Sequence, residues 1–261
     1  MPWRAAERPC ATPILNGVMQ AMSAAMYFLS KDCFVCRMGC YWIILSAKRD
    51  RYLCVAHAEL ASIGDRLHGW RIVSDSTGGP SSIGSEVDEL LKSLTSNGII
   101  TSNPTLGKPF AESECAAPEN RIEASESTAS AHVPLFWILR FFLACAKVDW
   151  QLRTKALSRT LARIERRRLL TGYSSNVRNT SHASSLVAAF QLLRPLYPRS
   201  YLCLFDSLAL LEFLAGYRIL PRIVFGVVAD PFEAHCWLQD GSTVINDGLE
   251  RVNKYKPILS L

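Results

Sequence analysis

The chain has 261 residues, of which 49% are hydrophobic and 20% are charged, so it can bury a core and is not disordered along its whole length. The formal net charge of +6 comes from one segment: residues 147–168 hold eight basic and two acidic residues, and bases and acids are equal in number in the rest of the chain. This distribution argues against a nucleic-acid-binding protein with a uniformly basic surface.

Residues 1–25 contain three prolines and lack the basic start and apolar stretch that mark a signal peptide. We interpret them as an N-terminal extension, because Met19, Met22 and Met26 are alternative starts. Without an export signal, the nine cysteines are more typical of reduced thiols than of a disulfide framework. We therefore expect a cytoplasmic protein.

Residues 26–101 predict a small domain of mixed strands and helices. An apolar run at residues 41–46, a polar turn, and a second apolar run at residues 51–55 are typical of a β-hairpin. Helical patterns follow over residues 59–67 and 85–98, and the second of these ends at a glycine.

The cysteines of this first block raise a metal site as an alternative. Cys33, Cys36 and Cys40 are closely spaced, and Cys54 and His57 are the nearby candidate ligands. Zinc sites usually pair two such clusters, or one cluster with histidines at short spacing. We expect no metal and interpret these cysteines as thiols of a small hairpin.

Residues 102–132 are rich in Ser, Glu, Ala and Pro and have almost no apolar periodicity, which predicts a linker. We expect a second domain over residues 133–261. It begins with helical spacing over residues 134–170, as one long helix or two, with the basic residues mainly off the apolar stripe on a solvated face. The longest apolar run, residues 133–146, is shorter than the about 20 residues that a membrane span needs, so we expect no span.

The last sixty residues predict a helix followed by three strands. The helix covers residues 203–215, and the strands cover residues 222–228, 234–239 and 243–245, with a tight Asp-Gly turn between the last two. This order places three chemically useful residues at the ends or edges of neighbouring elements.

Cys203 begins the predicted helix, where free backbone N–H groups and the helix dipole stabilise a thiolate. His235 lies in the second strand and Asp247 just past the third, which is the order of a nucleophile, a base and the group that orients the base. Strand alternation places His235 and Trp237 on one face and Cys236 on the other, so we expect Cys236 to pack away from the nucleophile.

The stretch from Cys203 to Asp247 resembles the leader peptidase of lasso-peptide biosynthesis, the B protein family. The resemblance rests on Cys203 at the head of a Ser-Leu-Ala-Leu helix, a strand ending in Gly226-Val227, the run Pro231-Phe232-Glu233-Ala234-His235-Cys236-Trp237, and Asp247 after a hairpin. Cys236 replaces a small residue of that pattern, and Asp206 stands where a basic residue is expected.

This resemblance implies an α+β fold in which a small winged-helix-like recognition domain precedes a transglutaminase-like, papain-related cysteine peptidase domain. In that family the leader peptide adds as a strand to the edge of a hairpin, beside a helix. The implied leader-binding residues are those of the second hairpin strand and of the apolar face of the following helix: Arg51, Tyr52, Leu53, Cys54, Val55, Val87, Leu90, Leu91 and Leu94. The alternative is an ordinary core hairpin and helix.

The implied function is cleavage of a ribosomally made precursor peptide at its leader–core junction, with Cys203, His235 and Asp247 as the catalytic residues. No cofactor is implied in this chain, and ATP is expected only at the partner, an asparagine-synthetase-like cyclase. The other expected partner is the precursor peptide, and neither nucleic acid nor a membrane is expected. Two alternatives remain open: a non-cleaving peptide-binding chaperone and a transglutaminase-type acyl transferase.

Overall fold

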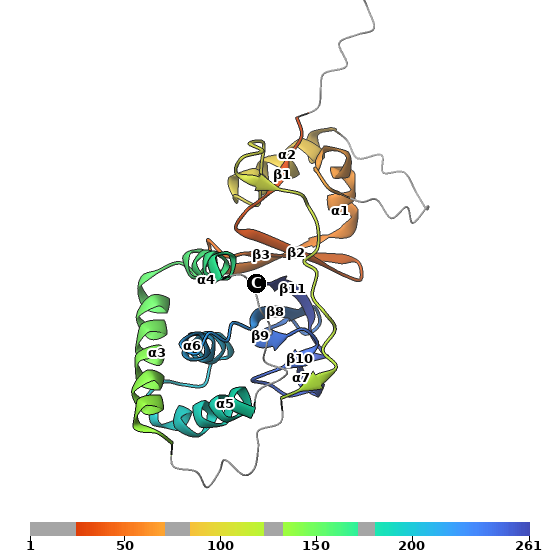
Figure 1. Cartoon of the computed structure of the whole chain (residues 1–261). Helices are drawn as coiled ribbons and strands as arrows, with labels where there is room; N and C mark the ends of the chain where they lie inside the picture. Colours follow the sequence, from red (N-terminus) through yellow and green to blue (C-terminus); the bar gives the residue numbers. More distant parts are fainter. Residues whose placement is uncertain (1–24, 71–83, 123–132, 172–180) are drawn as a thin grey trace, which may run out of the picture.

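The computed structural model describes residues 25–70, 84–122, 133–171 and 181–261, and within them the fold is a mixture of helices and sheets (Figure 1). The N-terminal half contains β1 (Phe28–Ser30), β2 (Cys33–Met38), β3 (Tyr41–Ser46), β4 (Arg51–Ala56), α1 (His57–Ser62), a 3-10 turn (Gly64–Arg66), α2 (Gly84–Ser96), β5 (Ile100–Thr101) and β6 (Gly107–Lys108). The C-terminal half contains β7 (Asn120–Arg121), α3 (Leu135–Thr154), α4 (Leu157–Thr171), α5 (Ser181–Leu193), a 3-10 turn (Arg194–Leu196), α6 (Cys203–Ala215), β8 (Arg222–Val228), β9 (Glu233–Asp240), β10 (Thr243–Val244), α7 (Leu249–Val252) and β11 (Lys256–Ser260).

The predicted hairpin is part of an antiparallel sheet with the order β2-β3-β4. Its register pairs Met38 with Tyr41 and Ser46 with Arg51, so both strands predicted from the sequence are confirmed. A second small sheet, β5-β1-β6, and the helix α2 complete the N-terminal half.

The β2-β3-β4 sheet lies between two hydrophobic cores. Alternate residues such as Ile44 and Leu53 pack with the apolar face of α2, whereas Ile43 and Leu45 pack with the core of the C-terminal half. Strands β2 and β3 also contact β11. The two halves of the chain are therefore joined by a shared sheet.

The C-terminal half is a five-stranded sheet with the order β11-β8-β9-β10-β7, covered on one face by helices (Figure 1). Helix α6 packs against β9 and is flanked by α3 and α5. Residues 205–214 of α6 are almost entirely buried, because this helix is apolar on all sides and lies at the centre of the layer. This buried helix fixes the position of its first residue, Cys203.

Residues 102–132 differ from the predicted free linker over the part that the structure describes. Strand β6 pairs with β1, β7 pairs in parallel with β10, and Phe110 is buried in the N-terminal core. Glu112 also accepts a hydrogen bond from Lys256 Nζ at 2.8 Å. Residues 102–122 thus attach to both halves, residues 123–132 lie outside the described part, and the division into two domains stays a prediction. The predicted extension, residues 1–25, lies outside it except for its last residue.

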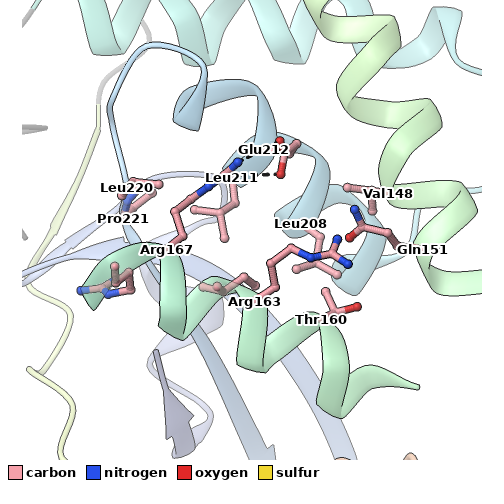
Figure 2. A pocket seen from close by; sticks show the side chains of 12 residues that line it. Val148, Gln151, Thr160, Arg163, Arg167, Leu208, Leu211, Glu212, Leu220 and Pro221 are labelled. Carbon is pink, nitrogen blue, oxygen red and sulfur yellow. Dashed lines mark hydrogen bonds and ion pairs between the residues drawn. The ribbon is translucent and has the colours of Figure 1, made fainter. Parts of the chain in front are cut away.

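The basic segment forms two helices, α3 and α4, and its charge is only partly solvated. Glu212 of α6 pairs with Lys147. It also pairs with Arg167 at 3.2 Å, as Figure 2 shows. Arg168 Nη1 donates to the carbonyl of Leu261 at 3.1 Å. The expected solvated face is therefore confirmed for Lys147, which is exposed, whereas Arg167 and Arg168 are partly buried. A cavity of about 30 Å³, lined by Arg167, Arg168, Glu212 and Thr160 among others, has room for water rather than for a larger ligand.

Among the described residues, no helix combines the length and the apolarity that crossing a bilayer would require.

Candidate active site

Cys203 is the first residue of α6, after Leu202 in an extended conformation. The first backbone hydrogen bond of the helix runs from the Asp206 N–H to the Leu202 carbonyl at 2.9 Å, so the N–H groups of the preceding turn have no partner inside the helix. These groups and the helix dipole favour negative charge on the half-buried thiol of Cys203.

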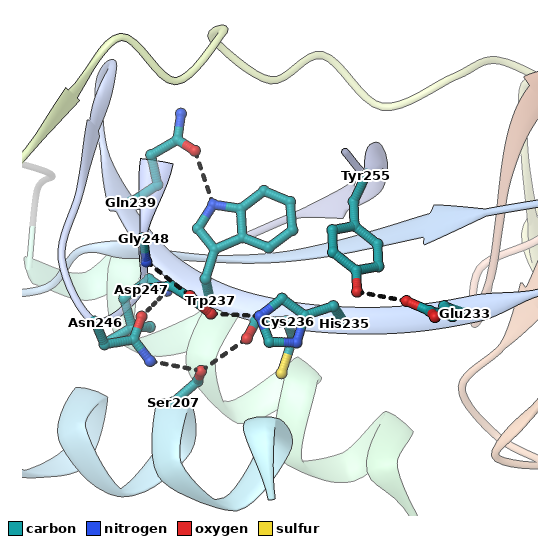
Figure 3. A network of polar contacts seen from close by, with 11 residues as sticks. Ser207, Glu233, His235, Cys236, Trp237, Gln239, Asn246, Asp247, Gly248 and Tyr255 are labelled. Atoms are coloured by element: carbon teal, nitrogen blue, oxygen red, sulfur yellow. Dashed lines mark hydrogen bonds and ion pairs between the residues drawn. The ribbon is translucent and has the colours of Figure 1, made fainter. Parts of the chain in front are cut away.

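His235 lies on β9 and is only 5% exposed. Its ring stacks near Trp237, with 6.1 Å between centroids, and lies 5.1 Å from the ring of Tyr255. Its Nε2 donates to Asp247 Oδ2, and the other carboxylate oxygen of Asp247 accepts the Gly248 N–H at 2.7 Å (Figure 3). Asp247 is thereby held by the turn that follows β10.

The hydrogen bonds of this group set its protonation. Hydrogen bonds from Cys236 and His235 lower the pKa of Cys203 to about 4, although burial opposes the shift. Burial alone would lower the pKa of His235, but hydrogen bonds to Asp247 and Cys203 outweigh it and raise that pKa to about 9. Burial would raise the pKa of Asp247, but hydrogen bonds from His235 and the Gly248 N–H, together with the nearby positive charges, outweigh it and lower that pKa. Near neutral pH the site therefore holds a thiolate, an imidazolium and a carboxylate.

The structure thus brings together the three predicted catalytic residues, Cys203, His235 and Asp247. A comparison with protein families matches residues 144–260 to the transglutaminase-like superfamily, and this range contains all three.

Residues 144–260 form a transglutaminase-like superfamily domain.

This superfamily includes cysteine peptidases and transferases, which is consistent with an enzyme. A search of curated proteins found no match, and a search of solved structures found none either. Within the described ranges, no group of three or more His, Cys, Asp and Glu side chains is arranged to hold a metal ion.

The expected orientation of Cys236 is wrong. Its side chain does lie on the opposite face of β9 from His235, but that face packs on α6, and the sulfur points toward this helix in Figure 3. The Cys236 thiol therefore faces the helix that begins at Cys203, and a hydrogen bond from it lowers the pKa of Cys203. Cys236 is a neighbour of the nucleophile and not a remote packing residue.

A polar network joins the helix, the strand and the turn that carry the three residues (Figure 3). Ser207 Oγ donates to the carbonyl of Cys236 at 3.1 Å and accepts from Asn246 Nδ2 at 2.9 Å. Asn246 Oδ1 in turn accepts the Leu238 N–H at 2.7 Å. These bonds fix the first turn of α6 against β9 and against the residue before Asp247.

Asp206, where the family pattern predicts a basic residue, pairs with Arg194. Arg194 is 4% exposed, and its Nη atoms also donate to three carbonyls of the loop that leads into α6, those of Tyr197, Arg199 and Ser200, at 3.0–3.2 Å. This pair lines a cavity of about 210 Å³ together with Tyr201, in the loop before α6, and Asn246, the residue before Asp247.

The predicted leader-binding residues lie on β4 and α2. Strand β4 is at the end of its sheet and pairs with β3 alone among the described strands, which leaves its outer edge open. Leu53 and Val55 contact the cluster that contains α2, whereas Arg51 and Cys54 are exposed. On α2, Val87 and Leu90 are partly exposed.

Two of the α2 residues are core residues. Leu91 and Leu94 are 4% and 5% exposed, so they support the surface beside β4 and do not offer a face to a peptide. The prediction of direct contact is wrong for these two.

Tyr52 connects β4 to the start of β9. Its ring lies 5.4 Å from that of Phe232, just before β9. Burial raises the pKa of Tyr52, and the nearby Cys236 and Cys203 raise it further. The predicted binding strand therefore contacts the residue that precedes β9.

Sequence reasoning missed Arg194, Ser207 and Asn246. Ser207 and Asn246 could have been identified from the sequence, because Ser207 is a polar residue within an apolar helix and Asn246 directly precedes Asp247. Arg194 could not have been, since its partners lie in a loop and a helix whose packing the sequence does not reveal.

Proposed function

We propose that this protein is a cysteine leader peptidase of lasso-peptide maturation, which binds the leader of a ribosomally made precursor and cleaves the leader–core junction. The observation that carries the proposal is the contact of the Cys203 thiolate with His235, which Asp247 holds in place. The transglutaminase-like domain supports it, because that superfamily includes cysteine peptidases.

In the proposed reaction, the Cys203 thiolate attacks the carbonyl carbon of the junction, and the free N–H groups at the start of α6 stabilise the oxyanion. The His235 imidazolium then protonates the departing core amine, and a thioester forms on Cys203. Neutral His235 next takes a proton from water, which attacks the thioester and releases the leader. Asp247 orients His235 throughout.

The open edge of β4 is the proposed leader site. An extended peptide added there would form backbone hydrogen bonds, with side chains selected by Leu53, Val55 and the exposed part of α2. Because Tyr52 on this strand contacts Phe232, just before the strand that carries His235, a bound leader would hold the junction near Cys203 and raise its effective concentration. The released core would pass to an asparagine-synthetase-like cyclase, which would supply the ATP chemistry.

Cleavage is tested with peptides encoded by short open reading frames beside this gene. The full chain should release a leader and a core, as measured by mass spectrometry, and the Cys203→Ala variant should leave the same peptide intact. Binding of the intact peptide by both proteins would instead support the chaperone reading. Cleavage undiminished in the variant would refute Cys203 as the nucleophile.

A transglutaminase-type acyl transferase is the second candidate, and the superfamily match is the observation that favours it. In that reaction an amine, not water, takes the acyl group from Cys203. Adding a primary amine such as cadaverine during turnover separates the two functions. A leader that carries the amine in place of a free carboxylate would favour the transferase.

Two neighbouring variants test the binding edge. Backbone N–H groups alternate along a strand, so one of Leu53→Pro and Cys54→Pro removes a bond to β3 and the other removes only an outward N–H. The variant that keeps the native circular dichroism spectrum should bind the precursor at least tenfold more weakly. Unchanged binding by that folded variant would refute addition at β4.

A further inference from the structure

The two sulfurs of Cys203 and Cys236 occupy one site, and their surroundings differ. Cys203 is half-buried at the start of α6, whereas Cys236 is 2% exposed and faces the same helix from β9. The Ser207 hydroxyl, one turn after Cys203, holds the Cys236 carbonyl at 3.1 Å. The backbones that carry the two thiols are thus fixed against each other, with a hydrogen bond between the sulfurs.

We propose that Cys203 and Cys236 form a reversible disulfide when a hydroperoxide oxidises Cys203, so that Cys236 is a resolving cysteine that protects the nucleophile and switches it off. The proposal rests on the proposed function only in its effect on activity. The disulfide itself depends on the positions of the two thiols.

The first step oxidises the accessible sulfur. The Cys203 thiolate attacks one oxygen of hydrogen peroxide, the O–O bond breaks, and the departing hydroxide takes a proton to become water. The product is a sulfenic acid on Cys203, in which sulfur has lost two electrons and peroxide has gained them. A thiolate is the form that reacts in this way, and this site holds one near neutral pH.

The second step closes the bond. Cys236 attacks the Cys203 sulfur, an S–S bond forms, and the hydroxyl leaves as water with the proton of Cys236. The balance is two thiols and one hydrogen peroxide giving one disulfide and two waters. While Cys203 is a thiolate, the pKa of Cys236 stands well above its usual range, firstly because its S–H donates to that thiolate. Oxidation removes this charge, so Cys236 becomes easier to deprotonate when it is needed.

A disulfide needs the sulfurs at about 2.05 Å, and the packing of β9 on α6 brings the two thiols into the same hydrophobic cluster. Burial keeps peroxide away from Cys236, and partial exposure of Cys203 lets a dithiol reductant attack the disulfide from outside. Oxidant and reductant therefore reach the pair at Cys203, and Cys236 is shielded from both. Cys40 is exposed between β2 and β3, outside this site, and serves as the control thiol.

Peptide mapping of the full chain tests the disulfide without any substrate. Trypsin places Cys203 in the peptide of residues 200–218 and Cys236 in that of residues 223–251, each with a single cysteine. After peroxide treatment and blocking of free thiols, the two peptides should appear linked, and dithiothreitol should separate them. The Cys40→Ala variant should give the same linked peptide.

Variants at position 236 supply the contrast. Cys236→Ser keeps a hydrogen-bond donor, and Cys236→Ala restores the small residue of the family pattern, so at least one should fold. Both should lack the linked peptide, and peroxide should drive their Cys203 to the sulfinic acid, which dithiothreitol does not reverse. Cleavage activity, where it is measured, should return with dithiothreitol in the wild type and not in the variants.

The proposal is overturned if peroxide modifies Cys203 in the wild type without a linked peptide, or if Cys203 links to another cysteine. It is also overturned if the wild-type Cys203 reaches the sulfinic acid as fast as in Cys236→Ser. A linked peptide in a protein that cleaves nothing would support the disulfide and refute the peptidase function separately.

Discussion

The Cys203 thiolate depends on two neighbours, first on Cys236 and next on His235, which also brings a positive charge. In the wild type, hydrogen bonds from Cys236 and His235 bring the pKa of Cys203 to about 4. The variant His235→Asn removes the His235 hydrogen bond and its positive charge and leaves the Cys236 contact. Loss of an opposite charge at contact distance typically moves a pKa by about 1–3 units, so the midpoint of thiolate formation should rise by that amount.

The assay is alkylation by iodoacetamide at a series of pH values, with the peptide of residues 200–218 followed by mass spectrometry so that other cysteines do not interfere. The wild-type rate should be level from about pH 5 upward and fall toward pH 4. In the variant, the decrease of the rate on acidification should begin at a higher pH than in the wild type. Its rate on the plateau above that pH should exceed that of the wild type, because a thiolate of higher pKa is more nucleophilic. The midpoint, and not the rate at one pH, is therefore the informative quantity.

Tyr255→Phe is the matched control, because it keeps the ring beside His235 and removes only the hydroxyl that donates to Glu233 at 2.9 Å. Its midpoint should equal that of the wild type. The reasoning is refuted if His235→Asn has an unchanged midpoint, or if the wild-type midpoint lies near the about 8.5 of a free thiol.

Three further outcomes follow from the same contacts. Asp247→Asn should lower the pKa of His235 from about 9, as read from ring-proton shifts in NMR titrations, and an unaltered titration would contradict the assigned hydrogen bond. Arg194→Met should lower the free energy of unfolding by about 3–5 kcal/mol in urea, since it leaves a partly buried Asp206 unpaired; a loss below about 1 kcal/mol would mean that the pair is not structural. For pH dependence, Cys203 has a lowered pKa and contributes stability that is complete above its unfolded value of 9.0 and is lost as pH falls through about 4. His235 has a raised pKa and contributes stability that is complete below 6.5 and is lost as pH rises through about 9. The stability difference between wild type and the double variant Cys203→Ala/His235→Asn should therefore rise from pH 4 to 6.5 and stay level to pH 9. A fall over the lower interval would contradict the lowered pKa of Cys203, and a continued rise over the upper interval would contradict the raised pKa of His235.

The arrangement of Cys203, His235 and Asp247 could be predicted because the elements that carry them are local and strongly patterned. The apolar helix α6, the β-branched strand β8 and the hairpin that follows can each be recognised from a short stretch of consecutive residues. Once their order is known, a helix start, a strand face and a turn meet at one place.

The orientation of Cys236 could not be predicted, although strand alternation gave its face correctly. Alternation says which residues share a face, but it does not say which face α6 covers. That depends on the packing of β9 against the helix, which involves residues far apart in the chain.

The packing of the two halves of the chain against one sheet also could not be predicted from the sequence. Residues 43–46 are buried without alternation, which is typical of a strand covered on both faces. This pattern was visible as an unbroken apolar run, but it does not identify the partners. Those partners are α2 on one side and the core around α6 on the other.

The central claim is that Cys203 cleaves a peptide held by this chain. The most direct measurement is mass spectrometry of the full chain incubated with peptides encoded by the short reading frames beside its gene, with Cys203→Ala in parallel. The account predicts one cut in one of these peptides, giving a leader and a core, by the wild type alone. If none of them is cut, or if Cys203→Ala cuts as fast as the wild type, the account is contradicted.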